Sequence, residues 1–591
     1  MKLTIIAQYH PAAALHQPRL WADMLEDWQH LPEKVPSDFR VASESEFEPD
    51  VTPIMSIDTE KDNLGGLGHW SVAFRDRENK LAVVPFYGKR RIEFGCPLVM
   101  HNAKYDLRVM HANDMREGEM VHDTMIAAYC LGLGKQAPKE DSKSKSGSNM
   151  VGGLGLKYLA RRHLGMQMQK WDDVKDKPEL VPEYNMKDSV ATLLLFEKWR
   201  LQLPKHYFDI DMPLLKVLMA MEDRGVKIDP DYLIEFGKEL DAQLASFDLP
   251  INPFATQDMQ SYIYGALEIE PWKFTDTGAP SVEEEVLETI PDELVKKCLE
   301  YKHLYKEKGT YVDNYIKAAD PNNRIHAEIK QTSTSTGRLS MARPNLQNVF
   351  KRDDRVKLRS LFCAEPGKVI GRLDFNQLDF RTLAAITQDP ILIKALNDNK
   401  KIHQVTADEL DISYDVAKTV NFATMFKGEA WALSQRLHIT IGEARAFINR
   451  YFEKFPNIKK YQDEMEAKIR AEKKVTIPWT NRTRRIDAMF TENWRIQQEG
   501  IKEGINMPVQ GLEAEVVKIV MIDLHYKHSA PMILQVHDEL LFELPEKDAK
   551  DYMLWLRDYV PTIVSFGGVK FTVEVGLGKN WYEAGLKDNS L

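Results

Sequence analysis

Little in this sequence marks a secreted, membrane-bound or zinc-knuckle protein. Its 591 residues include only four cysteines, Cys96, Cys130, Cys298 and Cys363, and no two of them form a CxxC pair. That spacing argues against a disulfide framework or a zinc knuckle and suits a reducing compartment. The N-terminus has no long apolar signal core, and no run of about 18 apolar residues occurs anywhere. We therefore expect a cytosolic protein, or its equivalent, without a membrane partner.

The chain also lacks the positive charge that often marks nucleic-acid-binding proteins. Its formal net charge is −10, with 43% hydrophobic and 28% charged residues, which is typical of an ordinary globular protein. Net charge governs solubility and long-range attraction rather than what a local cleft binds. A protein that gathers Asp and Glu to hold metal ions is acidic as well, so composition leaves nucleic acid open as a partner. At this length we expect several domains, because one core rarely serves more than about 250–300 residues.

Apolar patterns predict an α/β region, then a helical region, then a return to strands. In the first part, strand-like runs such as 53–57 alternate with helix-like ones such as 120–131. Residues 134–148 are of low complexity and are predicted to form an exposed loop. Helical patterns dominate from residue 213, among them the lysine-rich segment 292–317. That segment suits a phosphate grip, or equally the solvated face of a long helix.

A pair of carboxylates opens the first candidate site. Asp58 and Glu60 follow an apolar run, and on a strand both side chains point to one face, where they can share a hard cation. Asp106 adds a third acid and Asp188 a fourth, with Tyr184 one helical turn before Asp188. A single acid pair is more often a surface turn or strand than a metal site. Three such segments within an α/β pattern are much stronger evidence for a metal site.

A second set of acids lies far along the chain. Asp374 ends the strand-like run 368–373, while Asp538 and Glu539 interrupt two apolar runs in 532–544. Two buried strands that meet at an acidic tip are costly, because apolar neighbours raise carboxylate pKa values unless a cation compensates. The alternative is an exposed polar turn.

Between these acids, a helical pattern places Lys418 and Phe422 four residues apart. A helix would present the cation and the ring on one face, which suits a nucleoside triphosphate. Taken alone, Lys418 is more simply an ordinary surface lysine.

The segments of the first set, 58–60, 101–106 and 184–188, resemble the three motifs of the DEDDy class of 3′→5′ exonucleases. The resemblance implies that two divalent metal ions are held by Asp58, Glu60, Asp106 and Asp188. It also implies that Tyr184 helps to position the attacking water and that Asn102 contacts DNA. The expected reaction is two-metal hydrolysis.

The later segments resemble motifs A, B and C of family-A DNA polymerases, the bacterial polymerase I and phage-polymerase group. The motif segments are 372–381, 418–426 and 537–539, and further family signatures lie at 336–340, 344–348, 506–511 and 573–581. The resemblance implies an α/β and α+β multidomain fold. A ribonuclease H-like exonuclease domain would precede a right-hand polymerase domain of palm, fingers and thumb.

By this resemblance the polymerase site is built from three groups of side chains. Asp374 and Asp538 would ligate two Mg²⁺ ions, with Glu539 in a supporting catalytic role. The nucleotide site would comprise Gln377, Asp379, His403, Tyr414, Lys418, Phe422 and Phe426. The minor groove of the primer–template would meet Arg338, Asn506, Gln510 and His537.

The resemblance also divides the chain. The expected parts are an extension at 1–50, an exonuclease domain at 51–205 and a polymerase domain at 206–591, with the thumb at about 225–325, the palm at about 326–395 and 485–591, and the fingers at about 396–484. We expect no family-type 5′-nuclease domain upstream and no long thumb insertion that captures a processivity partner.

The implied cofactor is Mg²⁺, two ions per active site, with Mn²⁺ as a substitute. The implied partners are primer–template DNA and dNTPs, with an unseen processivity factor or helicase as a further possibility. The compact layout favours a replicative role in a phage-like system, hence the cytoplasm of a bacterial host, while an organellar matrix stays open.

Four nucleotide-site positions lead to predictions about substrate selection. Tyr414 stands where the family usually has an arginine, which predicts weaker nucleotide binding unless a nearby lysine substitutes; the candidates are Lys400, Lys401 and Lys427. Asp379 is shorter than the usual glutamate, and Phe426 lacks the hydroxyl of the usual tyrosine. Together they predict softened exclusion of ribonucleotides, unless the backbone shifts to compensate. Phe422 also lacks a hydroxyl and predicts discrimination against dideoxynucleotides.

Three other functions fit parts of the pattern. A single-subunit RNA polymerase shares the second acid set but not the proofreading motifs or the Gln377 and Asp379 pair. An exonuclease with an inactive DNA-binding platform is suggested by Tyr414. A purely structural DNA-binding protein would have no reason to keep two separated sets of metal ligands.

Overall fold

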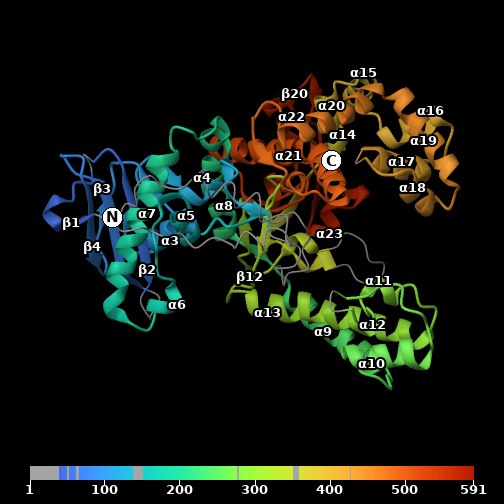
Figure 1. Ribbon diagram of the computed structural model, residues 1–591, viewed down its shortest axis with the longest axis horizontal. Helices are drawn as coiled ribbons and strands as arrows, with labels where there is room; N and C mark the ends of the chain where they lie inside the picture. Colours follow the sequence, from blue (N-terminus) through green and yellow to red (C-terminus); the bar gives the residue numbers. More distant parts are fainter. Residues whose placement is uncertain are drawn as a thin grey trace.

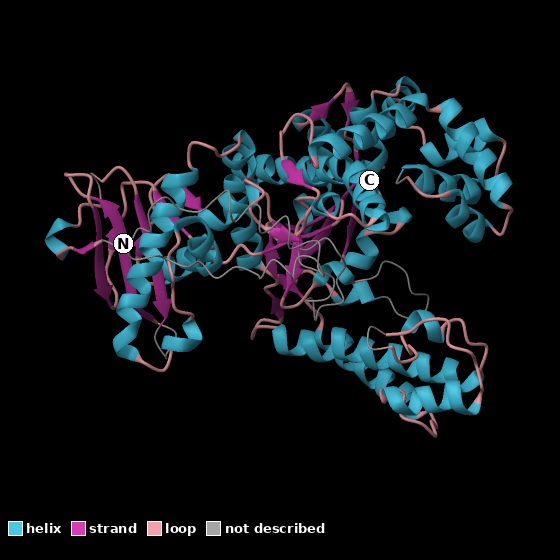
Figure 2. Cartoon of the chain, in the orientation of Figure 1, coloured by secondary structure: helices cyan, strands magenta, loops and turns pink. Residues whose placement is uncertain are grey.

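The computed structural model describes residues 39–49, 52–61, 66–136, 151–275, 278–349, 358–425 and 427–591. An α/β unit lies at one end, followed by a central body, with a helical arm below and a helical lobe at the far end (Figure 1). Figure 2 shows that the strands concentrate in the α/β unit and in the central body, whereas the arm and the lobe are helical. Of the predicted extension at 1–50, only 39–49 are described.

The α/β unit, which we call the N-terminal unit, is built on a six-stranded sheet of order β1-β4-β3-β2-β6-β8. Its strands are β1 (Arg40–Val41), β2 (Met55–Lys61), β3 (Leu67–Arg75), β4 (Leu81–Tyr87), β6 (Leu98–Met100) and β8 (Val121–Asp123). Strands β2, β3 and β4 are antiparallel, and β6 and β8 continue parallel to β2. The strand predicted at 53–57 is confirmed as β2, which runs on through Asp58 and Glu60.

Helices cover the sheet of the N-terminal unit. They are α3 (Ala103–Ala112), α4 (Thr124–Cys130), α5 (Leu156–Leu164) and α7 (Val181–Trp199), and α7 packs on β2 and β3. The prediction of a helix over 120–131 is wrong at its start, because 121–123 form the buried edge strand β8. A strand of three residues is too short to show the two-residue alternation that is typical of strands. Asp123 then caps α4, because its side chain accepts a hydrogen bond from Met125 N.

Little of the predicted loop at 134–148 can be described. Lys135–Gln136 form β9, which pairs with β10 (Val151–Gly152), and the stretch between them lies outside the described residues.

The central body holds a four-stranded antiparallel sheet of order β18-β19-β15-β22. Its strands are β15 (Lys368–Phe375), β18 (Met532–Val536), β19 (Glu539–Pro545) and β22 (Val573–Gly578). These confirm the strands predicted at 368–373 and on both sides of the acidic tip. The helices packed around it are α8 (Met212–Arg224), α14 (Leu378–Thr387), α21 (Trp494–His528), α22 (Glu546–Ile563) and α23 (Trp581–Ala584).

The arm comprises α9 (Pro230–Ala245), α10 (Thr256–Gln260), α11 (Glu284–Leu287), α12 (Glu293–Glu307) and α13 (Asn314–Ala318). The helix predicted over 292–317 is confirmed, with a π-helical stretch, η5 (Lys308–Asp313), between α12 and α13. A small core of its own closes the tip, where Met259, Ile263 and Val295 are buried. The arm falls within the segment predicted as the thumb.

The lobe comprises α16 (Ile402–Leu410), α17 (Tyr414–Met425), α18 (Ala430–Leu437) and α19 (Ile441–Lys454), joined to the body by α15 (Pro390–Asn397) and α20 (Pro456–Glu472). After α20 the chain forms the hairpin β16 (Lys474–Thr476) and β17 (Thr483–Arg485). Among the described residues, no helix combines the length and hydropathy that a membrane crossing requires.

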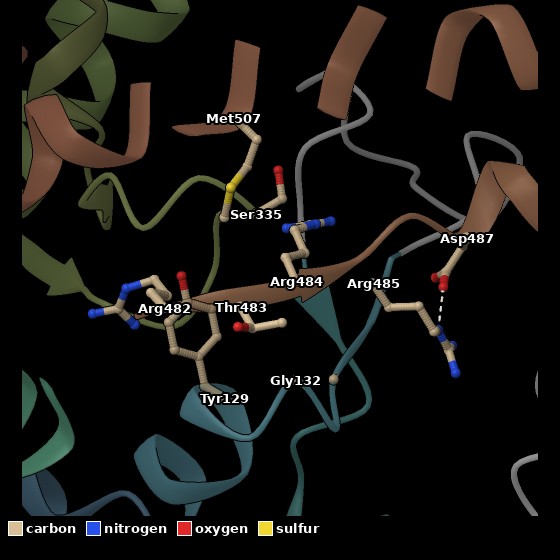
Figure 3. A pocket seen from close by; sticks show the side chains of 10 residues that line it. Tyr129, Gly132, Ser335, Arg482, Thr483, Arg484, Arg485, Asp487 and Met507 are labelled. Atoms are coloured by element: carbon tan, nitrogen blue, oxygen red, sulfur yellow. Dashed lines mark hydrogen bonds and ion pairs between the residues drawn. The ribbon is translucent and has the colours of Figure 1, made fainter. Parts of the chain in front are cut away.

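The hairpin strand β17 and its flanks face the N-terminal unit. Figure 3 shows Arg482, Arg484 and Arg485 opposite Tyr129 and Gly132. Tyr129 lies in the last turn of α4, and Gly132 comes just after this helix. The Tyr129 hydroxyl donates to the backbone oxygen of Thr334 at 2.8 Å. The N-terminal unit and the central body are thus in direct contact at this junction.

Two candidate metal-dependent sites

The first acid set converges at the edge of the N-terminal sheet. Strand β2 carries Asp58 and Glu60 on one face, and α7 brings Asp188 to them, so that carboxylate oxygens of all three lie within 4.8 Å of one another. Asp106 of α3 stands beside this group, where its Oδ1 accepts from Thr59 N at 3.0 Å and Thr59 Oγ1 at 2.7 Å. Tyr184 lies one turn before Asp188 on α7 and is hydrogen-bonded to it.

Burial makes ionisation of these acids costly. It raises the pKa of Glu60 to about 7 and that of Asp106 to about 8, with mutual repulsion among the acids adding to both shifts. Burial likewise raises the pKa of Asp188 to about 6, although Lys157 opposes the shift. The pKa of Asp58 is also well above its usual range, first through burial and then through its three acidic neighbours. Clustered oxygen ligands of this kind fit hard divalent cations.

Two further side chains at this site were missed by sequence reasoning. Asn185 donates from Nδ2 to Asp58 Oδ2 at 2.5 Å, which fixes the orientation of that carboxylate. The Lys157 ammonium pairs with Asp188. Asn185 lies inside the third motif, so its proximity was a readable signal, whereas no spacing connects Lys157 to the acids. Asn102 caps α3 in a left-handed conformation, with φ 68, and its side chain is exposed.

The second acid set lies at the end of the central sheet where β15 finishes and β19 begins. Asp374 is paired across the strands with Glu539, and Phe375 N donates to the backbone oxygen of Asp538 at 3.0 Å. His537, with φ 55, turns the tip between β18 and β19. This antiparallel register therefore brings two acids that are far apart in sequence to one end of the sheet.

Glu539 points into a buried ionic network rather than into solvent. Its carboxylate, on a residue 4% exposed, contacts Arg359 at 3.3 Å and Arg372 at 3.1 Å, and Trp581 Nε1 donates to it. Burial opposes its ionisation, yet the two arginines hold the pKa of Glu539 below its usual range. Arg372 also pairs with Asp374. This arrangement fits a positioning role for Glu539, transmitted to Asp374 through Arg372.

A cavity of about 540 Å³ opens beside Asp538. Predicted residues that line it are Arg338, Gln377, Asp379, Phe422, His537 and Asp538. Glu513 of α21 also lines it and accepts from Arg338, and sequence reasoning missed it because a long helix offers no spacing that singles out one acid. Burial raises the pKa of Asp379 to about 6, with Asp538 adding to the shift.

The face of α17 presents the predicted nucleotide-site residues in a row. Tyr414, Lys418 and Phe422 are spaced by four residues on this helix. His403 of α16 packs between two of them, with ring centroids 5.7 Å from Tyr414 and 5.5 Å from Phe422. Burial lowers the pKa of His403, and the Lys418 charge lowers it further. Phe426 lies outside the described residues.

The Gln377 side chain lines the cavity, but both of its polar atoms are hydrogen-bonded to backbone groups. Its Nε2 donates to Lys400 O at 3.0 Å and its Oε1 accepts from Ile402 N at 2.7 Å, so that its amide fixes the start of α16. Asn506 and Gln510 are partly buried one turn apart on α21. Their assigned contacts with nucleotide or DNA stay predictions.

A third group of possible ligands, Cys130, His206 and Asp211, is buried at the junction. Arg482 donates to both Asp211 oxygens, at 3.0 and 2.9 Å, and His206 Nδ1 lies 2.8 Å from Oδ2. Lys518 is 3.9 Å away. A divalent cation does not fit here, because two cationic side chains already surround the carboxylate.

The two acid sets lie on two separate sheets, one in the N-terminal unit and one in the central body, and the helical arm and lobe extend from the central body (Figure 1). The family pattern described as "DNA polymerase family A" matches residues 235–583, and that described as "3'-5' exonuclease" matches residues 52–204. The chain belongs to DNA polymerase family A and carries an N-terminal 3′-5′ exonuclease domain. The predicted family and fold class are confirmed.

Curated relatives include two proteins named DNA polymerase I. That of Synechocystis sp. is 28% identical over 94% of this chain and 61% of its own length, and that of Bacillus subtilis is 30% identical over 78% and 55%. The chain thus spans about three fifths of the length of these relatives. A solved structure, the POL domain of Pol1 from M. smegmatis in complex with DNA primer-template and dNTP, matches with a TM-score of 0.77 at 20% identity, covering 91% of this chain and 97% of that one. This likeness shows a shared fold.

Proposed function

We propose that this chain extends primers on DNA templates with dNTPs and removes nucleotides from primer 3′ ends at a second site. The observation that carries the proposal is the presence of two separate carboxylate sets, each on the sheet of a different family-matched region. The relatives' names and the DNA and dNTP bound to the M. smegmatis protein point the same way.

At the polymerase site, Asp374 and Asp538 would hold two Mg²⁺ ions, or Mn²⁺ in their place, which supply activation of the primer hydroxyl and charge stabilisation at the leaving pyrophosphate. Lys418 and His403 would contact the triphosphate, and Phe422 would stack beside the incoming nucleotide. The primer–template minor groove would meet Arg338, Asn506, Gln510 and His537.

At the exonuclease site, the acids Asp58, Glu60, Asp106 and Asp188 would hold two divalent ions, which supply a nucleophilic water and charge stabilisation at the phosphorus. Tyr184, hydrogen-bonded to Asp188, would orient that water. Asn185 would keep the Asp58 carboxylate turned toward the shared site.

The decisive experiment follows primer extension and 3′-end degradation side by side. Asp538→Ala is expected to abolish extension and keep degradation, and Asp58→Ala to do the reverse. Asp551→Ala, which removes an exposed acid of α22, serves as the control and should keep both activities. If either site variant left both activities intact, the two-site proposal would be refuted.

Tyr414 favours one rival, an exonuclease whose polymerase half only binds DNA. The tyrosine is 42% exposed on the nucleotide face of α17 and supplies no cation there. Degradation without any dNTP-dependent extension by the unaltered chain would support this rival. Extension with rNTPs alone would instead identify an RNA polymerase.

We further propose a replicative role in a phage-like system, with processivity supplied by a partner protein. In the described residues of the arm, 225–275 and 278–325, the helices follow one another, and the segment between α9 and α12 adds only the small core at the tip. Single-encounter extension in the presence of a DNA trap should therefore give short products. Long products from the chain alone would contradict the need for a partner.

A further inference from the structure

Lys157 brings a positive charge into the exonuclease centre. Its ammonium pairs with Asp188 and lies 3.9 Å from the centroid of the Tyr184 ring. The side chain is 25% exposed, so the charge is only partly screened by solvent. One lysine thus touches both a proposed metal ligand and the residue proposed to orient water.

The fold fixes the position of this lysine. Lys157 lies in the first turn of α5, and α5 packs against α7, the helix that carries Asp188 and Tyr184. Leu159 and Ala160, which follow Lys157 on α5, are fully buried in the core of the N-terminal unit. Its place beside Asp188 therefore comes from helix packing and not from a chance surface contact.

The Lys157 charge also acts on the rest of the acid cluster. It opposes the rise in the pKa of Asp58 and of Glu60 that burial causes. Among the described residues, Asp188 is the only hydrogen-bond partner of its ammonium. Within the described part of the chain, departure of the ammonium from Asp188 therefore breaks a single hydrogen bond.

The cation beside Asp374 at the other site is held more firmly than Lys157. Arg372 pairs with Asp374 in the same way, but Arg372 is also bound to the buried Glu539 at 3.1 Å. Arg372 is therefore anchored in a network, whereas Lys157 can exchange Asp188 for the face of the Tyr184 ring. A cation over an aromatic face keeps part of its stabilisation.

We propose that Lys157 is a resident cation of the exonuclease centre that competes with divalent metal for Asp188 and so sets the metal concentration at which this centre is loaded. The inference rests on the proposed exonuclease function of the site. The ammonium and a metal ion would share the Asp188 carboxylate and repel each other, so that loading requires the ammonium to move aside. Lys157 is thus a positioning residue that acts through Asp188.

Metal binding to the full chain tests this directly. Mn²⁺ titrations followed by electron paramagnetic resonance would use an Asp374→Ala/Asp538→Ala background, so that only the exonuclease centre contributes. Lys157→Met keeps the length and apolar stem but removes the charge, and it is expected to tighten Mn²⁺ binding on the order of tenfold. Lys157→Arg keeps the charge and should bind Mn²⁺ as weakly as the parent.

Lys187→Met provides the matched control. Lys187 neighbours Asp188 in sequence but pairs with Glu183 at 2.6 Å, one turn away on α7. Its loss should leave Mn²⁺ affinity within about twofold, since its charge is paired with Glu183 rather than with a proposed metal ligand. Equal Mn²⁺ affinity in the parent and in Lys157→Met would overturn the inference, as would tightening in Lys157→Arg.

Folding and function are separated by two further measurements. Thermal melting in excess Mn²⁺ reports whether Lys157→Met folds, and Lys157→Gln, which keeps a hydrogen-bond donor, replaces it if it does not.

In the otherwise unaltered chain, Lys157→Met should lower the metal concentration for half-maximal 3′-end degradation and leave that for extension unchanged. Tighter binding without any degradation by the parent would sink the exonuclease proposal alone. Degradation with unaltered binding would sink the role of Lys157 alone.

Discussion

The Arg338 guanidinium donates to the carboxylate of Glu513 inside the cavity beside Asp538. The Arg338 side chain is about half exposed and that of Glu513 is nearly buried. The pair therefore links the surface of the cavity to the buried side of α21. Burial raises the pKa of Glu513 to about 7, and Asp379 and Asp538 add to the shift while Arg338 opposes it. The Glu513 carboxyl is therefore only about half ionised near pH 7.

Replacing Glu513 should change stability in a pH-dependent way. A carboxyl whose pKa is raised in the folded state contributes stability below its unfolded pKa, and that contribution is lost as the pH rises through about 7. Glu513→Gln, which cannot ionise, should match the parent near pH 4 and exceed it at pH 8 by up to about 3 kcal/mol. Urea unfolding at both pH values measures this. A parent that is the more stable protein at pH 8 would show that the Arg338 pair outweighs burial.

The exonuclease acids predict a coupling between metal and pH. The pKa values of Glu60, Asp106 and Asp188 are raised to about 7, 8 and 6, so their contribution to stability is lost as the pH rises between about 5 and 8. Melting temperature in EDTA should therefore fall over this range, and added Mg²⁺ should restore it most at high pH. Asp58→Asn/Asp188→Asn should flatten both effects. A metal effect that is constant from pH 5 to 8 would contradict the assignment.

Tyr414→Arg should strengthen nucleotide binding. The residue stands on the same face of α17 as Lys418 and is exposed, so that an arginine there has room to reach a phosphate. Steady-state extension should show a lower KM for dNTP, by about tenfold, the low end for one charged hydrogen bond, with kcat nearly unchanged. Asp415→Asn raises the net charge by the same single unit at a neighbouring position and tests for unspecific attraction. An unchanged or raised KM in Tyr414→Arg would be evidence that a nearby lysine already fills the role.

Phe422→Tyr should relax discrimination against dideoxynucleotides. The ring lines the cavity beside Asp538, and a phenol there supplies a hydroxyl that can stand in for the missing 3′-hydroxyl. The ratio of kcat/KM for dNTP over ddNTP should fall by at least about threefold, the worth of one hydrogen bond. Phe380→Tyr, a ring in contact with His403 but buried in the core, controls for an added hydroxyl elsewhere. An undiminished ratio in Phe422→Tyr would rule out this role.

Asp379→Glu combined with Phe426→Tyr should sharpen exclusion of ribonucleotides. Asp379 lines the cavity, and its Oδ1 accepts from its neighbour Phe380 N at 2.8 Å, a contact that turns the short carboxylate back toward its own helix. The longer glutamate would extend further into the cavity. Incorporation of dNTP against rNTP should shift toward dNTP in the double variant. Equal and high selectivity in the parent would show that the backbone already compensates.

The sequence was sufficient wherever a short-range pattern determines the structure. Alternation on β2 places Asp58 and Glu60 together, and a helical turn places Tyr184 beside Asp188, so the first acid set was predictable from spacing. The strands on both sides of Asp538 were predictable as apolar runs. The family resemblance then joined acids that no local rule connects.

Packing between distant elements was not predictable. Lys157 and Glu513 each touch a proposed site residue, yet they enter from α5 and α21 through contacts that leave no periodic trace. Glu539 illustrates the same limit. Its place in the acidic tip suggested a role beside the metal ligands, and only the burial of its carboxylate among Arg359, Arg372 and Trp581 shows what it binds.

The buried charges at the junction have a consequence for how the two sites share a substrate. Asp211, Arg482 and Glu515 come from three segments and have almost no exposed surface, and Arg482 donates to both acids. Pulling one partner away would strand a buried charge at a cost of about 3–5 kcal/mol. All three residues lie outside the region that matches the exonuclease pattern, so the network stiffens the central-body side of the junction. Under the proposed function, a primer end that passes from one site to the other would meet this stiff surface at the junction and would have to unpair from its template to cross it.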